Sequence, residues 1–177
     1  NYTFKATFPT DTEETFGIVM TGRIAATDDP DVELGTLDNS LHYFTFNGAE
    51  IVERRQVVDE AKCDACHNEI RGHGEQRFGV DTCVMCHRPN LSEGDESINL
   101  KDMLHSIHRG VDLEFDEEYE LLDLEHVRFP GKLQQCTMCH LPNTYGTPLP
   151  EEAQPSIVAE ELIPATRAAC VTCHDSV

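Results

Sequence analysis

Every cysteine of this 177-residue chain lies in a Cys-x-x-Cys-His pentapeptide. The four cysteine pairs are Cys63 and Cys66, Cys83 and Cys86, Cys136 and Cys139, and Cys170 and Cys173, each followed directly by His67, His87, His140 or His174. Two thiols three residues apart lie on one side of a helical turn, where each can form a thioether with a vinyl group of haem, and the next histidine can reach the iron. The pattern predicts four covalently bound c-type haems, around which the fold must be organised.

The eight cysteines could instead form disulfides or bind zinc. An exported chain could form four disulfides, and the first two pairs have the spacing Cys-x2-Cys-x16-Cys-x2-Cys, typical of four-cysteine zinc sites. Neither use requires a histidine directly after the second cysteine of every pair. The chain holds only nine histidines, so four such coincidences are improbable and the sequence favours haem.

The composition is poorly suited to a conventional core. Hydrophobic residues make up 39% of the chain, aromatic residues 7%, and tryptophan is absent. Four haems would each supply a large flat apolar face, so we expect little regular secondary structure between the motifs. The formal net charge of −20 argues against nucleic acid or anionic membranes as partners. It is explained most simply by solubility, with a basic redox partner or a bound cation as alternatives.

The expected location is outside the cytoplasm. No apolar run of about 18 residues is present, which predicts that the chain does not span a membrane. No signal peptide is visible, Asn1 is interpreted as a processed terminus, and the first residue is not a cysteine that could carry a lipid anchor. Because haem is attached covalently after export, we expect a secreted protein of the periplasm or the cell exterior.

Residues 1–58 contain no cysteine and are predicted to form a small strand-rich N-terminal module. Alternating apolar side chains over residues 2–8 and an apolar run over residues 17–20 favour strands, and residues 28–31 favour a turn. The clearest prediction is a hairpin in which residues 41–46 pair with residues 49–52 across Asn47-Gly48, because both turn residues accept positive φ.

Residues 59–177 are predicted to form the tetrahaem domain, with short helices and long loops. A helix is predicted over residues 99–109, where apolar residues recur at helical spacing, Asn99 can cap the start and Gly110 can end it. Residues 112–125 hold eight acidic side chains, interpreted as a solvated surface, with calcium binding as a less favoured alternative. Residues 142–155 are expected to be a connector, and Pro164 to open a short helix.

Histidines are the preferred axial ligands of the irons. Low-spin electron-transfer haems need a second axial ligand, either histidine or methionine, and the methionines lie in the attachment motifs, the helix stripe or the β module. The candidate distal ligands are the five histidines outside the motifs: His42, His73, His105, His108 and His126. His105 and His108 lie one turn apart on the predicted helix and can point at two different haems. Four irons need four distal ligands and five histidines are available, which leaves His42 and His126 as alternatives for the fourth iron.

From residue 55 onward the chain resembles one pentahaem half of the OmcA/MtrC outer-surface multihaem cytochromes. The matching pieces are the first motif followed by His73-Gly74 and Arg77, the second motif, Leu104 to Gly110, Phe129-Pro130-Gly131 before Cys136, and Ala169 to Ser176. The resemblance implies that His73, His105 and His108 are distal ligands and that a strand-rich domain precedes the haems. The family continues to a fifth motif, so this chain resembles a tetrahaem variant.

The expected function is electron transfer rather than enzymatic catalysis, with no catalytic residues. The tetrahaem design is similar to that of the OmcE-like cytochromes, which polymerise into extracellular filaments in which a neighbour can contribute an axial histidine. We expect bis-histidine haems to pass electrons to a redox protein, an extracellular acceptor or an identical subunit of such a filament, with His42 or His126 crossing the junction. The alternatives are a monomeric soluble shuttle and a multihaem reductase, which would need an iron with an open coordination position.

Overall fold

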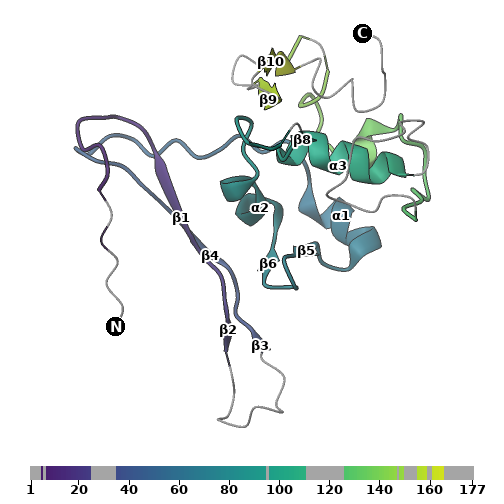
Figure 1. The fold of residues 1–177 in the computed structure, drawn as a ribbon, viewed down its shortest axis with the longest axis horizontal. Helices are drawn as coiled ribbons and strands as arrows, with labels where there is room; N and C mark the ends of the chain where they lie inside the picture. The colour runs from purple at the N-terminus through teal and green to yellow at the C-terminus, as the bar shows by residue number, and fades with distance from the viewer. Residues whose placement is uncertain are drawn as a thin grey trace.

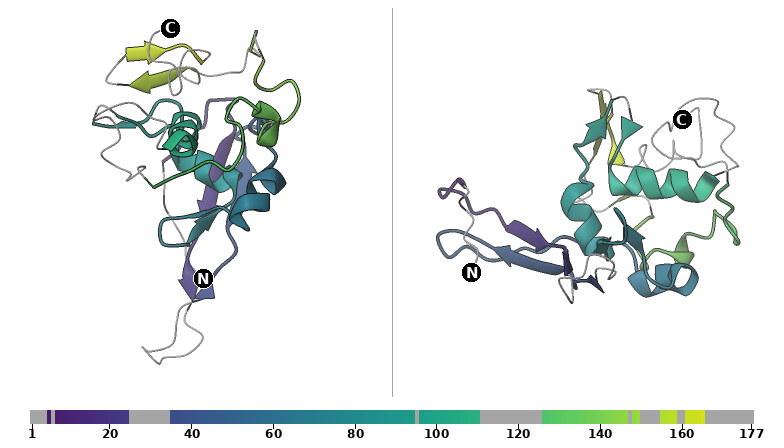
Figure 2. Two further views of the ribbon diagram at one scale, coloured as in Figure 1. Left: turned by 90° about the vertical axis from the view of Figure 1, so that its right-hand side faces the viewer. Right: turned by 60° about the horizontal axis from the view of Figure 1, so that its bottom comes forward.

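The computed structural model describes residues 5, 7–24, 35–94, 96–110, 126–146, 148–149, 155–158 and 161–165. Within these ranges the chain forms three α-helices, a short 3-10 helix and five two-stranded antiparallel sheets. A long β ribbon extends away from the part that contains the helices (Figure 1), and the right-hand view in Figure 2 shows the same arrangement. This agrees with the predicted small sheets, short helices and long loops.

The β ribbon is built from the N-terminal residues. β1 (Phe16–Met20) pairs with β4 (Ser40–Phe44), and β2 (Arg23–Ile24) pairs with β3 (Gly35–Thr36) farther out. The two ladders follow one another along the same two segments, so they form one long hairpin in Figure 1. The predicted apolar run over residues 17–20 is therefore confirmed as a strand, whereas the turn predicted over residues 28–31 lies outside the described residues.

The hairpin predicted across Asn47-Gly48 is only partly correct. Both residues adopt positive φ, 57° and 71°, and the Ala49 N–H donates to the Phe46 carbonyl oxygen over 3.1 Å, as the predicted turn requires. Residues 49–52 form no strand, however, because β4 pairs with β1 instead. The local turn signal was right, and the pairing inferred from it was wrong.

Four phenylalanine rings explain why β1 is the preferred partner. The rings of Phe8, Phe16, Phe44 and Phe46 form a cluster with centroid separations of 5.4–6.0 Å, within the range in which aromatic pairs attract. Phe16 and Phe44 lie directly opposite one another in the ladder. The segment 49–52 contains no aromatic residue with which to compete.

The helices contain the described cysteine motifs, in whole or in part, and the two candidate ligands His105 and His108. α1 (Glu60–His67) contains the first motif, α2 (Val80–Cys86) contains the cysteines of the second, and η2 (Cys136–Met138) opens the third. α3 (Leu100–Arg109) carries His105 and His108. The fourth motif lies outside the described residues.

The predicted helix over residues 99–109 is confirmed together with its end signals. Asn99 caps α3 by accepting the Lys101 N–H over 3.2 Å, and Asp59 caps α1 by accepting the Ala61 N–H over the same distance. Gly110 follows the last residue of α3 with φ 50°. The cap and the terminal glycine of α3 are local in sequence, which is why they could be predicted, whereas the cap of α1 was not predicted.

Three short hairpins in the haem-motif region were not predicted. They are β5 (Arg71–Gly72) with β6 (Arg77–Phe78), β7 (Ser92–Glu93) with β8 (Glu96–Ser97), and β9 (Ser156–Val158) with β10 (Glu161–Ile163). The described part of the connector over residues 142–155 contains no helix or strand, as expected. The acidic segment 112–125, and with it the calcium alternative, lies outside the described residues, as does nearly all of the helix expected after Pro164.

The apolar core within the described residues is very small. Val84 and Leu100 are the buried hydrophobic residues there, at 7% and 8% exposure. Burying such side chains contributes about 1.5–3 kcal/mol each, far below the conformational entropy lost when a chain of this length orders. The fold therefore needs another source of apolar contact, as the low hydrophobic content predicted.

Candidate haem sites

The described cysteine motifs form helical turns that bring the thiols and the histidine together. The His87 N–H donates to the Cys83 carbonyl oxygen and the His140 N–H to that of Cys136, both over 2.9 Å, and the first motif lies within α1. All six described cysteines are free. The described residues also hold no group of three or more His, Cys, Asp or Glu side chains placed for a metal ion. Among the described residues, the cysteines of these three motifs thus form neither a disulfide nor a four-cysteine cluster.

Each described motif histidine faces a histidine from outside the motifs. The ring-centroid separations are 5.9 Å for His67 and His108, 5.9 Å for His73 and His87, and 6.0 Å for His105 and His140. Two imidazole nitrogens that each lie about 2 Å from a shared metal ion place the ring centroids roughly 6 Å apart. The three pairs therefore have the separation expected for two axial ligands of one iron.

Hydrogen bonds determine which nitrogen is free on two of these rings. Nδ1 of His87 lies 2.8 Å from the Ile98 carbonyl oxygen, and Nδ1 of His108 lies 2.7 Å from that of Leu104. A carbonyl oxygen can only accept, so Nδ1 carries the proton and Nε2 keeps its lone pair. Metal-ligating histidines usually donate their second ring N–H in this way, so both rings are prepared to bind through Nε2.

Three further histidines of these pairs lie in surroundings that favour the neutral ring. Burial is the main cause that lowers the pKa of His73, His105 and His140. At His105 the Lys101 carbonyl and the Asp102 carboxylate act in the opposite direction. A metal binds the neutral imidazole, so burial keeps these rings in the form that an iron requires.

The first and third motifs are joined by backbone hydrogen bonds. Val58 forms an isolated antiparallel bridge with His140, and the Asp59 N–H donates to the Cys139 carbonyl oxygen over 3.0 Å. The Lys62 ammonium group on α1 donates to the His140 carbonyl oxygen, also over 3.0 Å. Residues 57–62 and 139–144 are joined by these and neighbouring hydrogen bonds into one structural unit, which we call the motif ladder.

The second motif is joined to the first through a side chain. Oε2 of Glu60 on α1 accepts the Val80 N–H over 3.1 Å at the first residue of α2. The carboxylate thereby satisfies one of the N–H groups that a helix start leaves without an internal partner. The three described motifs are consequently held against one another by α1.

The hairpin β5–β6 presents His73 from a strained turn. His73, Gly74 and Glu75 all have positive φ, at 54°, 67° and 63°, a region that costs a non-glycine residue roughly 1–2 kcal/mol. The β ribbon supports this turn: the Arg23 guanidinium donates to the Gly74 carbonyl oxygen, and the Thr36 hydroxyl donates to that of Glu75 over 3.3 Å.

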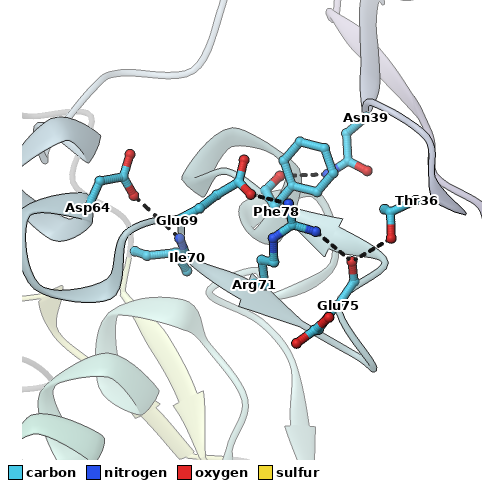
Figure 3. A network of polar contacts seen from close by, with 8 residues as sticks. All are labelled: Thr36, Asn39, Asp64, Glu69, Ile70, Arg71, Glu75 and Phe78. Atoms are coloured by element: carbon cyan, nitrogen blue, oxygen red, sulfur yellow. Dashed lines mark hydrogen bonds and ion pairs between the residues drawn. The ribbon is translucent and has the colours of Figure 1, made fainter.

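A polar network continues from this turn into α1 (Figure 3). Arg71 forms an ion pair with Glu69, and its guanidinium lies 5.1 Å from the centroid of the Phe78 ring. The Asn39 amide of the ribbon donates to the Phe78 carbonyl oxygen over 2.6 Å, and Asp64 of α1 accepts the Ile70 N–H over 3.3 Å. The N-terminal ribbon therefore helps to position a candidate iron ligand.

His42 and His126 take part in none of the three pairs, and both are exposed. His42 lies opposite Ile18 in the β1–β4 ladder. The other face of that sheet rests on α2, because a Cβ at Gly17 would lie 2.5 Å from Met85 of the second motif. His42 thus belongs to the face of the ribbon that is turned away from the second motif.

The helical cysteine motifs with facing histidines are those of a multihaem c-type cytochrome. Residues 55–177 match the family model described as outer membrane cytochrome MtrC/MtrF-like, domains II/IV, and the chain belongs to this family. The family's multihaem cytochromes carry out extracellular electron transfer at the cell exterior or surface. Comparison with curated proteins gave no match. Among the described helices, none has the length and apolar character needed to cross a membrane.

The structure adds site residues that the sequence patterns did not reveal. Glu60, Asn39 and Arg23 act through hydrogen bonds to backbone groups far along the chain. Such contacts leave no periodic signal and no fixed spacing in the sequence. The separate sites of His105 and His108 were predicted, whereas the motif that each one faces was not.

Proposed function

We propose that the protein carries electrons through four covalently attached c-type haems, one at each cysteine motif, and that it is not an enzyme. The observation that carries this proposal is the set of three facing histidine pairs. In this assignment His67, His87, His140 and His174 are the proximal ligands, and His108, His73 and His105 are the distal ligands of the first, second and third haems. A bound haem supplies one-electron redox chemistry at its iron, and two histidines keep that iron low-spin.

The fourth haem takes its distal ligand from the two remaining candidates. His126 could supply it within the chain, and His42 could supply it to a neighbouring subunit. The proposed division into an N-terminal module, residues 1–58, and a tetrahaem domain, residues 59–177, is compatible with either choice. Residues 57–59 lie at this boundary and are already bonded to the third motif.

The contacts around α3 support close spacing of the first and third haems. Their proposed distal ligands lie one turn apart on this helix, and the motif ladder joins their attachment sites. Met103, Leu104 and Ile107 of α3 are half-buried apolar residues, suited to pack against haem faces. Short separations between haems are what rapid electron transfer along the chain requires.

A reductase is a weaker proposal, because it needs an iron that is open to substrate. The three described motif histidines each face another histidine, which argues against an open coordination position at those sites. A monomeric electron shuttle would share the same haems and ligands. It differs from the filament proposal only in how the subunits associate.

We further propose that the chain assembles with identical subunits into a conductive filament. Ile18 and Met20 on β1 are exposed at 47% and 61%, and His42 lies opposite Ile18 on β4. Apolar side chains beside an exposed histidine are suited to cover a neighbour and contribute a ligand to it. A head-to-tail contact of this kind propagates instead of closing.

Mass spectrometry and absorption spectroscopy of the native protein test the proposed cofactors. The denatured, reduced chain should exceed the polypeptide mass by four haem masses, and the oxidised protein should show only low-spin ferric haem. Zinc with no added haem mass would overturn the cofactor assignment. A high-spin ferric fraction in the intact protein would favour the reductase.

A further inference from the structure

Arg55 has a buried donor without a described partner. Its Nη1 atom is buried and forms no hydrogen bond with the described residues. A guanidinium stays charged at all relevant pH values and has only donors to offer. A buried, charged donor that lacks an acceptor costs more free energy than a neutral one, so an acceptor is expected beside this atom in the native protein, and an anion would match its charge best.

The motif ladder fixes the location of Arg55. Two residues later, the Val57 carbonyl oxygen accepts the Leu141 N–H over 3.0 Å and the Thr144 hydroxyl over 2.8 Å. Three residues along from Arg55, Val58 forms an antiparallel bridge with His140 itself. Arg55 therefore lies beside the third haem site.

Further cations lie around Arg55. Burial lowers the pKa of the neighbouring Arg54, and the charge of Arg55 acts in the same direction. Burial also lowers the pKa of Lys101 on α3, where the Asp102 carboxylate acts in the opposite direction and the charge of Arg54 acts in the same direction as burial. The Asp81 carboxylate acts in the opposite direction to burial at Arg54. Like charges gathered at one place repel unless an anion lies among them.

This arrangement is unusual for a chain with 33 acidic and 13 basic residues. Carboxylates are abundant, yet within the described ranges none accepts a hydrogen bond from Arg55 Nη1. By contrast, Arg71, which is partly exposed, pairs with Glu69. The anion that satisfies Arg55 is therefore expected to come from something other than the described side chains.

We propose that Arg55, with Arg54 beside it, binds a propionate carboxylate of the haem attached at Cys136 and Cys139. The proposal rests on the proposed function, because the propionate arrives with the haem. Arg–carboxylate pairs can form two parallel hydrogen bonds, which suits a planar guanidinium. The cation also disfavours the more positive ferric state, so Arg55 raises the reduction potential of this haem.

The test compares Arg55→Gln with Arg55→Lys and with Arg128→Gln, which removes the same charge from an exposed position. Haem methyl resonances followed by NMR through a redox titration report each haem separately. A His105→Met variant, which alters the proposed axial ligand of the third haem, identifies its resonances. Arg55→Gln should shift the oxidised-to-reduced ratio of that haem about tenfold toward the oxidised form, or 59 mV for a one-electron couple. Arg55→Lys should shift it less.

Three outcomes would overturn the assignment. Arg55→Gln could change the reduction potential of the third haem no more than Arg128→Gln does. It could shift the potentials of all haems equally, or it could lower the stability of the protein without changing any potential. In the last case the partner of Arg55 would be a carboxylate of the chain itself. The mass of the denatured wild-type chain is measured in parallel. Four haem masses with an unchanged potential would refute the propionate site alone, whereas a missing haem mass would refute the proposed function.

Discussion

His105 and His108 lie one turn apart on α3, yet they face histidines of two different motifs, His140 and His67. Residues three apart on a helix project from neighbouring but distinct positions on its surface. A single ten-residue helix can therefore define the distal side of two redox centres. Any shift of α3 would move both candidate ligands together, which would couple the geometry of the first and third proposed sites.

Separate replacement of these histidines should affect separate haems. His105→Ala is expected to convert the third haem to high spin and His108→Ala the first, because each variant removes one axial ligand. Electron paramagnetic resonance of the oxidised variants measures the change, and the double variant should show two high-spin haems. If both single variants perturbed the same haem, the pairing would be wrong.

The first haem should differ spectroscopically from the second and third. Its proposed ligand rings, His67 and His108, are inclined by 79°, whereas the other pairs are inclined by 29° and 12°. Nearly perpendicular axial imidazoles leave two iron d orbitals close in energy, which makes the low-spin ferric signal strongly anisotropic. We expect that signal in the wild-type spectrum and its selective loss in His108→Ala. Its retention in this variant together with loss in His73→Ala would assign it to the second haem instead.

Gly110→Ala should destabilise the protein by roughly 1–3 kcal/mol. Gly110 has φ 50°, and a Cβ there would overlap the Val127 carbonyl oxygen, which belongs to the backbone and cannot rotate away. Denaturant unfolding of the holoprotein measures the effect. Gly146→Ala is the matched control, since a Cβ at that position would meet nothing within 4 Å, and it should change stability by no more than about 0.5 kcal/mol.

Assembly should depend on the exposed face of the ribbon. Electron microscopy of native material is expected to show filaments, and His42→Ala should shorten or abolish them while the subunit keeps its haems. Ser40→Ala, at an exposed position of the same strand, should leave assembly unchanged. Monodisperse single subunits that are indifferent to loss of His42 would favour the soluble shuttle.

Features encoded within a few neighbouring residues could be predicted from the sequence. α3 has its cap, its periodicity and its terminal glycine within one short segment, and the turn at Asn47-Gly48 needs only two residues. The partner of β4 could not be predicted, because it depends on phenylalanines from three separated segments. Likewise, stoichiometry favoured histidines as distal ligands, and only the three-dimensional arrangement shows that His73 faces the histidine of the second motif.

The motif ladder has a consequence for how the protein matures. The hydrogen bond between Thr144 and Val57 spans 87 positions of sequence, and contacts between such distant residues close late in folding. The contacts between the first and third motifs therefore require closure of a long loop, which leaves an interval before the two motifs meet. A haem held only by axial bonds could dissociate during that interval. Two thioether bonds at Cys63 and Cys66, as proposed, would retain the haem while the chain is still unfolded around it.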